Sequence, residues 1–168
     1  MKRKEFLRYS AGSFVGMLYA PTFLKGQKTE NTEPYEPAIV KEFVGAGHNN
    51  LAKVKEMLLS YPNIIYAAYD WGNGDFETAL EGAGHMGDKE IANFLIEKGA
   101  RSNIFILTML GKTDLVKPVL EEWPALINSS GAHGFTLLHH AQRGGAEAEP
   151  LLNYLLEKGL RETKFSIN

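Results

Sequence analysis

The sequence predicts an all-α protein, built as a solenoid of about four short helix–turn–helix repeats. The tetrapeptide Gly-Ala-Gly-His occurs at residues 45–48 and again at residues 82–85, and the apolar positions that follow agree without a gap. The pentapeptide at residues 95–99 is similarly matched by that at residues 155–159. Internal matches of this kind are typical of stacked repeats, in which each unit buries its apolar face against a neighbour.

Residues 1–24 have the composition of an export signal. A basic head at residues 2–8 is followed by an uncharged, largely apolar run at residues 9–24. This pattern is typical of secretory signals, and the run is shorter than the roughly 20 residues of a membrane-spanning helix. The head resembles the twin-arginine motif, with Lys4 in place of the second arginine. We therefore expect an exported protein, periplasmic in a bacterium, with an uncleaved membrane anchor as the alternative. The polar residues 25–37 are expected to form a linker.

The clearest repeat comprises two predicted helices, residues 78–86 and 88–98. In the second helix the apolar side chains fall on one broad face, as in an amphipathic helix. Asp88 stands where an N-cap belongs, and Gly99 stands where a left-handed residue ends a helix. Gly87 is expected to make the turn between the two helices.

Residues 78–100 and 134–160 resemble the ankyrin repeat, whose pattern begins approximately G-x-T-P-L-H-x-A-A. The resemblance covers residues 38–160 and implies helix pairs joined by β-hairpin fingers, with partner proteins bound in a concave groove. It assigns His139 a structural hydrogen-bonding role, and the adjacent His140 is expected to be buried. The departures from the family's pattern are Ala79 and Leu137 at the usual proline and Glu81 at the usual histidine.

The repeats are expected to be uneven. The third unit is short, because its turn glycine follows that of the second by only 24 residues, against about 33 in the family. The missing length falls at its finger, whereas the finger at residues 66–77 is long. Pro118 predicts a kink or a late start in the second helix of the third unit. The expected units are residues 38–66, 67–100, 101–128 and 129–160, followed by a C-terminal tail at residues 161–168.

Composition excludes several kinds of chemistry. The chain has no cysteine, which removes disulfides, thiolate metal sites and a cysteine nucleophile. Its formal charge is −2, and basic residues do not cluster beyond the N-terminal head, so nucleic acid is not an expected partner. No serine stands in a nucleophile turn, and no glycine loop suited to phosphate precedes a helix. We expect no enzymatic activity, no cofactor and no bound metal.

His48 and His85 occupy equivalent positions in neighbouring repeats. Adjacent packed helices lie about 8–10 Å apart, and zinc needs ligand nitrogens at about 2.0–2.1 Å. Both rings would therefore have to lean inward to share an ion, and no third ligand is evident, so a role in packing or partner binding is favoured. The glycines of residues 45–47 and 82–84 have two explanations, of which close helix contact is favoured over room for a ligand.

We expect a protein–protein interaction module, with the partner in the groove beside the finger. Trp71 is either an exposed binding anchor or part of the core, and the acidic finger is expected to be a solvated loop. One alternative is an enzyme or small-ligand protein that uses the groove near His48 and His85, and another is a stabilising subunit of a larger periplasmic complex. The candidate contact residues are His48, Asn49, Asp70, Trp71, Asp75, Glu77, His85, Met86, Met109, Leu110, His133 and Arg143.

Overall fold

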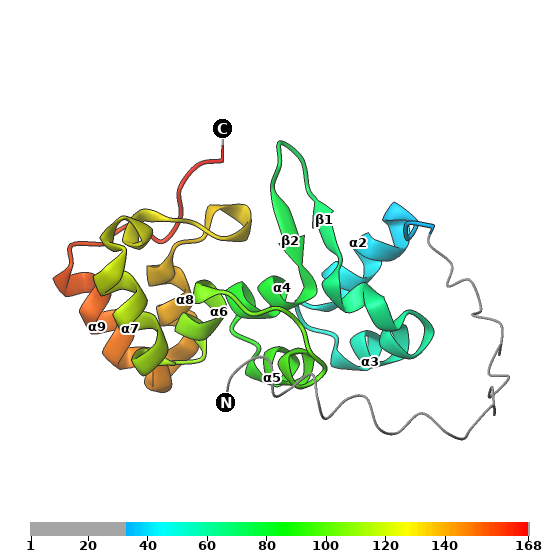
Figure 1. Cartoon of the computed structure of the whole chain (residues 1–168), viewed down its shortest axis with the longest axis horizontal. Helices are drawn as coiled ribbons and strands as arrows, with labels where there is room; N and C mark the ends of the chain where they lie inside the picture. The colour runs from blue at the N-terminus through cyan, green and yellow to red at the C-terminus, as the bar shows by residue number, and fades with distance from the viewer. Residues whose placement is uncertain (1–32, 168) are drawn as a thin grey trace, which may run out of the picture. The chain divides into compact units, whose positions relative to one another are not determined.

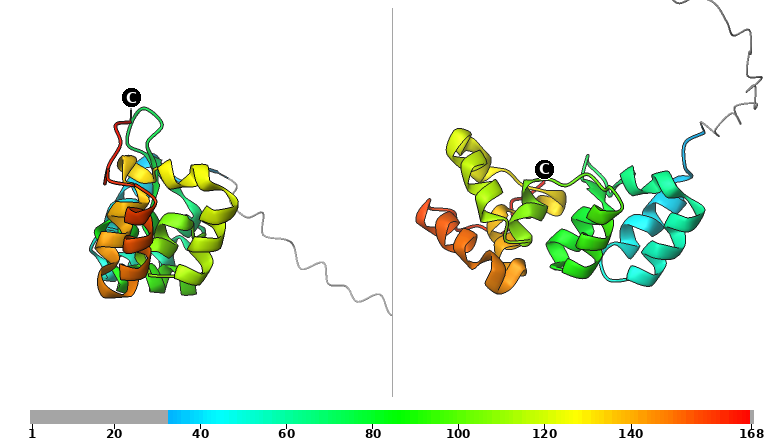
Figure 2. Two further views of the ribbon diagram at one scale, coloured as in Figure 1. Left: turned by 90° about the vertical axis from the view of Figure 1, so that its left-hand side faces the viewer. Right: turned by 60° about the horizontal axis from the view of Figure 1, so that its bottom comes forward.

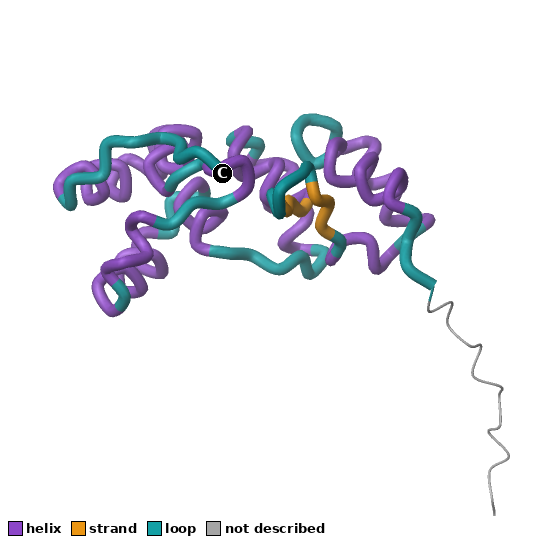
Figure 3. The backbone as a smooth tube through the Cα atoms, turned by 90° about the horizontal axis from the view of Figure 1, so that it is seen from above, coloured by secondary structure: helices purple, strands orange, loops and turns teal. Residues whose placement is uncertain are grey.

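The structure, a computed structural model, describes residues 33–167. The part from Tyr35 onward is one compact unit. The predicted export segment, residues 1–24, and most of the predicted linker lie outside the described residues. The all-α prediction is confirmed, since helices make up most of the described chain and two short strands accompany them, as Figure 3 shows. Within the described residues, no helix is both long and apolar enough to span a bilayer.

Between residues 33 and 167 the α-helices follow one another as four pairs (Figure 1). The two helices of each pair pack against each other, and the first helices of successive pairs also pack together (Figure 2). The pairs are α2 (Pro37–Ala46) with α3 (Leu51–Ser60), α4 (Ala79–Met86) with α5 (Lys89–Glu97), α6 (Ile104–Met109) with α7 (Thr113–Glu122), and α8 (Leu137–Gly144) with α9 (Glu149–Glu157). The connections contain the short 3-10 helices η1 (Pro62–Tyr66), η2 (Pro124–Asn128), η3 (Ala132–Gly134) and η4 (Gly145–Ala148).

The caps expected for the second pair are present. The Thr78 hydroxyl accepts a hydrogen bond from the Glu81 backbone, and the Glu81 carboxylate accepts one from the Thr78 backbone. This reciprocal capping box satisfies two amide groups that the first turn of a helix leaves unpaired. Asp88 caps α5 by accepting from the backbone of Ile91. Gly87 has φ +79°, so it makes the left-handed turn between α4 and α5.

The apolar faces of the helix pairs form two adjoining cores. The first lies among α2 to α6, the second lies among α6 to α9, and α6 contributes to both. Because α6 has packed helices on both sides, Met109 is completely buried and Leu110 is almost so. Both had been expected in the partner groove, but they belong to the first core and a partner cannot reach Met109.

Pro118 lies in the interior of α7, which begins at Thr113. The late helix start expected from the proline is therefore wrong. The residues around it explain why the helix tolerates the loss of a backbone donor. Val116 and Leu120 are buried in the second core on either side of Pro118, so tertiary packing favours the helix despite its local cost.

A β-hairpin finger precedes the second helix pair. β1 (Ala68–Asp70) pairs antiparallel with β2 (Phe76–Thr78), and Figure 1 shows the hairpin standing away from the helices. In contrast, residues 98–103 lead from α5 to α6 without a strand, as expected for the shortened third unit. The connection before α8 instead contains η3 and an isolated bridge between Ser130 and Thr136.

The C-terminal segment packs against this last connection. The Thr136 backbone donates to the carbonyl of Thr163, and the Phe165 backbone donates to the carbonyl of Gly134. The Thr136 hydroxyl also donates to the carbonyl of Glu162. Residues 162–165, which were expected to be part of a tail, thus hold the turn before α8 in position.

Candidate metal centre

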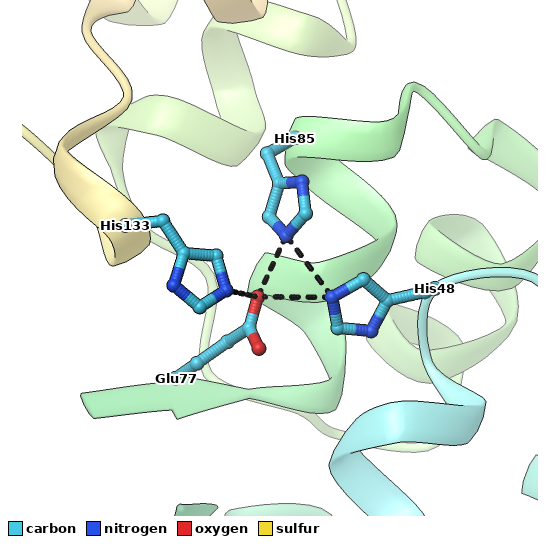
Figure 4. Close-up of side chains that lie close together, drawn as sticks. All are labelled: His48, Glu77, His85 and His133. Carbon is cyan, nitrogen blue, oxygen red and sulfur yellow. Dashed lines mark hydrogen bonds and ion pairs between the residues drawn. The ribbon is translucent and has the colours of Figure 1, made fainter. Parts of the chain in front are cut away.

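Four potential metal ligands from distant parts of the sequence converge beside the finger. His48 lies in the turn after α2, Glu77 lies on β2, His85 lies in the last turn of α4, and His133 lies on η3. Figure 4 shows the three imidazoles pointing toward the Glu77 carboxylate. One ligand atom from each residue lies within 4.8 Å of those of the other three.

The distances between these ligand atoms suit a tetrahedral ion. Glu77 Oε1 lies 2.7 Å from His85 Nε2 and 3.4 Å from the Nε2 atoms of both His48 and His133. The Nε2 atoms of His48 and His85 are 3.2 Å apart. Ligand atoms at about 2.0–2.1 Å from a tetrahedral zinc ion are separated from one another by about 3.3–3.4 Å. These four separations lie at or below this value, and all six separations are within 4.8 Å, so small movements of the side chains would bring the four atoms around one ion.

His48 reaches the centre because α4 carries a glycine beneath its ring. A Cβ atom on Gly82 would lie only 2.8 Å from His48 Nδ1, so any larger residue would displace the imidazole. Gly47, in contrast, meets the backbone of Ala79, where its Cβ would come within 2.3 Å of the carbonyl oxygen. The favoured explanation, close packing, therefore applies to both glycines, since Gly47 lies against the backbone of α4 and Gly82 lies against the imidazole of His48.

Glu77 is completely buried, and its two oxygens have different tasks. Oε1 faces the imidazoles, whereas Oε2 accepts a hydrogen bond of 2.8 Å from the indole nitrogen of Trp71. Trp71 is 38% exposed and packs edge-to-face on Tyr69. Trp71 is therefore neither an unconstrained binding anchor nor a core residue. It is a partly exposed side chain whose hydrogen bond fixes the orientation of the Glu77 carboxylate.

His85 is held from the side of the fourth helix pair. Its ring stacks on Phe135, with centroids 5.0 Å apart. Its backbone carbonyl accepts hydrogen bonds from His139 Nε2 at 2.9 Å and from Arg143 Nε at 3.2 Å. The structural hydrogen bond expected of His139 is thus present. His140 is buried, as expected, and its Nδ1 donates to the carbonyl of Thr136.

The electrostatics of the cluster favour a charged centre. Burial alone would raise the pKa of Glu77, but its hydrogen bonds to His48 and His85 and their charge outweigh burial and lower the pKa to about 2. The hydrogen bond to Glu77 raises the pKa of His48 in turn, against the effect of desolvation. In contrast, desolvation lowers the pKa of His139 and lowers that of His140 to about 4. The two histidines outside the cluster therefore stay neutral near pH 7.

The other candidate contact residues are spread around the centre. Asp75 bonds His133, and Asp70 accepts from the backbone of Gly72 at the finger tip. Asn49, Met86 and Arg143 are exposed. No third ligand for His48 and His85 was evident from the sequence. Glu77 and His133 were predicted as groove residues, but their convergence with the two histidines was not predicted.

Comparison with known proteins adds no family. No protein-family model matches the sequence, and a search of curated proteins finds no significant match. The function is therefore inferred from the geometry and chemistry of the site.

Proposed function

We propose that this protein binds one divalent transition-metal ion of the zinc class through His48, Glu77, His85 and His133. The observation that carries the proposal is the convergence of three imidazole nitrogens and one buried carboxylate oxygen within 4.8 Å of one another. Imidazole is a favoured ligand of zinc, copper, nickel and iron, whereas calcium and magnesium select oxygen ligands. A centre with three nitrogens therefore favours the first group of ions.

The surroundings of the ligands support this proposal. His48 Nδ1 bonds the carbonyl of Val44 and His133 Nδ1 bonds the carboxylate of Asp75. These oxygens can only accept, so both Nδ1 atoms carry protons, and in the neutral form of each imidazole the Nε2 lone pair faces the centre. Metal-binding histidines nearly always have such a partner on the second ring nitrogen. In the metal-free protein, hydrogen bonds join the imidazoles to the Glu77 carboxylate, and a bound metal ion would take the place of the protons in these bonds.

The number of ligands favours a binding or stabilising role over catalysis. Structural zinc sites have four protein ligands, whereas catalytic sites have three and keep a position open for water or substrate. Glu77 is completely buried and His85 nearly so, and four side chains saturate a tetrahedral ion. We therefore propose that the ion is bound for stability or sensing and that the chain is not an enzyme.

Zinc titration of the metal-free protein tests the proposal. Calorimetry should give one site per chain, and mass spectrometry of the desalted complex should find one zinc and no calcium or magnesium. His85→Asn should weaken binding by more than the roughly 10–100-fold that loss of an outer partner costs. His139→Gln keeps a donor for the His85 carbonyl and should bind zinc as the natural protein does. Absence of bound zinc in the natural protein would overturn the proposal.

A second candidate function concerns the surface around the centre. We propose that the four helix pairs are degenerate ankyrin-type repeats and that the finger binds another protein. In support, the finger carries two exposed aromatic side chains, Phe76, which is 59% exposed, and Trp71, which is 38% exposed, and tryptophan is among the residues favoured at binding hot spots. In a pull-down, Phe76→Ser should lose a partner that Leu59→Ser, a change of an exposed apolar residue on α3, retains. Equal capture by both variants would argue against a finger interface.

We further propose that residues 1–24 direct export, because a basic head and a short apolar run are typical of secretory signals. Fractionation of bacterial cells should find the full chain outside the cytoplasm and a chain that starts at residue 25 inside it. Equal distribution of both chains would contradict export by this segment.

A further inference from the structure

His133 reaches the centre from an unusual backbone position. It has φ +58°, in the left-handed region that residues other than glycine seldom adopt. Asp75 at the finger holds it there with both carboxylate oxygens. Oδ1 accepts the backbone N–H of His133 at 2.8 Å, and Oδ2 accepts Nδ1–H at 2.6 Å. The two residues are 58 positions apart in the sequence.

The second of these bonds determines which ring nitrogen of His133 can bind a metal. An ionised carboxylate offers only lone pairs, so the Nδ1 atom that faces Asp75 must carry the proton. In the neutral ring Nε2 then has the lone pair, and it lies 3.4 Å from Glu77 Oε1 on the side of the centre. Asp75 thus fixes the backbone, the ring orientation and the tautomer of His133 together.

His133 is also the ligand that comes from the far side of the third helix pair. His48, Glu77 and His85 all precede α6, whereas His133 follows α7. Residues 98–103 supply no strand between the two regions, so the finger of the second pair and η3 of the fourth pair contact each other directly. A metal ion bound by all four ligands would therefore join parts of the stack that are not neighbours in sequence.

We infer that Asp75 is a positioning residue of the metal centre and that metal binding fastens the turn at residues 131–135 to the finger. This inference rests on the proposed metal-binding function. In the metal-free protein the hydrogen bonds from His133 to the finger are the two to Asp75, while Glu77 and Trp71 of the finger lie close to its ring. The bound ion adds a bond from Nε2, so the turn opens only when that bond also breaks.

Asp75→Asn tests the positioning role, because asparagine has the same shape but offers one acceptor and one amide donor. If the amide faces Nδ1, the proton of His133 must move to Nε2, where it blocks the metal. If it faces the backbone N–H instead, two donors oppose each other. Zinc affinity should fall roughly 10–100-fold, as for loss of an outer partner. Cobalt(II) bound to this variant should show an absorption spectrum altered by loss of one nitrogen ligand, a signature that general destabilisation would not produce.

The matched control is Asp70→Asn, which changes the other aspartate of the finger. Asp70 Oδ1 accepts from the backbone of Gly72, a task that the asparagine oxygen can also perform. This variant should keep the zinc affinity and the cobalt spectrum of the natural protein. Equal affinity and identical spectra for Asp75→Asn would overturn the positioning role.

Hydrogen exchange of backbone amides tests the fastening. Zinc should slow exchange both in the finger and at residues 131–135 of the natural protein. His133→Gly removes the ligand at a position where φ +58° suits glycine, so the fold should persist. In this variant zinc should still protect the finger through the three remaining ligands, but not residues 131–135.

The possible failures can be told apart. If the natural protein binds no zinc in the titration, the proposed function fails and the inference falls with it. If zinc binds but exchange at residues 131–135 is unchanged, the fastening alone is refuted. If zinc protects that turn equally in the natural protein and in His133→Gly, the protection does not come from the His133 bond and the inference is again refuted.

Discussion

Replacing Gly82 with alanine should weaken metal binding while the protein remains folded. Gly82 lies within α4, where alanine is favoured over glycine by roughly 0.5–1 kcal/mol. The new Cβ would, however, lie 2.8 Å from His48 Nδ1 and 2.9 Å from its Cε1. Non-bonded heavy atoms are at their best separation at about 3.5–4.0 Å, so the imidazole of His48 must move.

The size of the displacement sets the expected effect. Restoring ordinary contact requires the ring to shift by roughly 0.7 Å. Metal ligands must be held within about 0.5 Å of their productive positions, so His48 can no longer coordinate without strain. We expect zinc affinity to fall roughly 10–100-fold, the usual cost of losing support for a ligand, which corresponds to about 1.4–2.8 kcal/mol. The unfolding free energy of the metal-free protein should change by less than about 1 kcal/mol, because improved helix propensity offsets part of the clash.

Zinc calorimetry and urea unfolding in the presence of a chelator measure the two quantities separately. Gly45→Ala is the matched control, since it makes the same change in α2 at a position where a Cβ meets no atom within 4 Å. It should stabilise the protein slightly and leave zinc affinity unchanged. Zinc binding by Gly82→Ala as tight as that of the natural protein would refute the assignment of His48 as a ligand. If Gly82→Ala and Gly45→Ala weakened zinc binding equally, the effect would come from the change in helix propensity and not from the clash with His48.

Three further substitutions test the roles of Trp71, His140 and Pro118. Trp71→Phe removes the donor to Glu77 Oε2 and should weaken zinc binding roughly 10–100-fold in calorimetry, whereas Trp123→Phe, at a tryptophan that is 59% exposed, should not. Burial lowers the pKa of His140 to about 4, below its value in the unfolded chain. As the pH falls from 6.5 to 4, the unfolded chain therefore takes up a proton at this residue before the folded protein does, and the free energy of unfolding decreases. Over this pH range the free energy of unfolding, measured with urea in the presence of a chelator, should fall by about 3 kcal/mol less in His140→Asn than in the natural protein. Pro118→Ala restores a backbone donor inside α7 and should raise the unfolding free energy by about 2–3 kcal/mol; an unchanged midpoint would contradict this.

Local signals were sufficient to predict the second helix pair. Thr78, Gly87 and Asp88 act on backbone groups within a few residues of themselves, so their roles can be read without knowing the fold. The late helix start expected from Pro118 was wrong for the complementary reason. Its local cost was judged correctly, but the burial of neighbouring side chains in the second core outweighs that cost, and burial is a property of the assembled stack.

The metal centre was only half predictable. His48 and His85 could be paired because each ends the same Gly-Ala-Gly-His tetrapeptide, and the helices that carry the two tetrapeptides, α2 and α4, pack together. Glu77 and His133 stand in no such relation to them. Their approach depends on how far η3 extends toward the finger, which no spacing in the sequence encodes.

The shortness of α6 and of the connection before it explains how Glu77 and His133 come together. In stacked repeats each unit normally contacts only its immediate neighbours, and a finger before α6 would stand between the fingers on either side. Residues 98–103 provide no strand there, and α4 and α8 pack directly against each other past the six-residue α6. His139 and Arg143 can therefore bond the carbonyl of His85, and His133 can approach Glu77. The irregularity that weakens the repeat pattern in the sequence is thus the feature that brings the four ligands together.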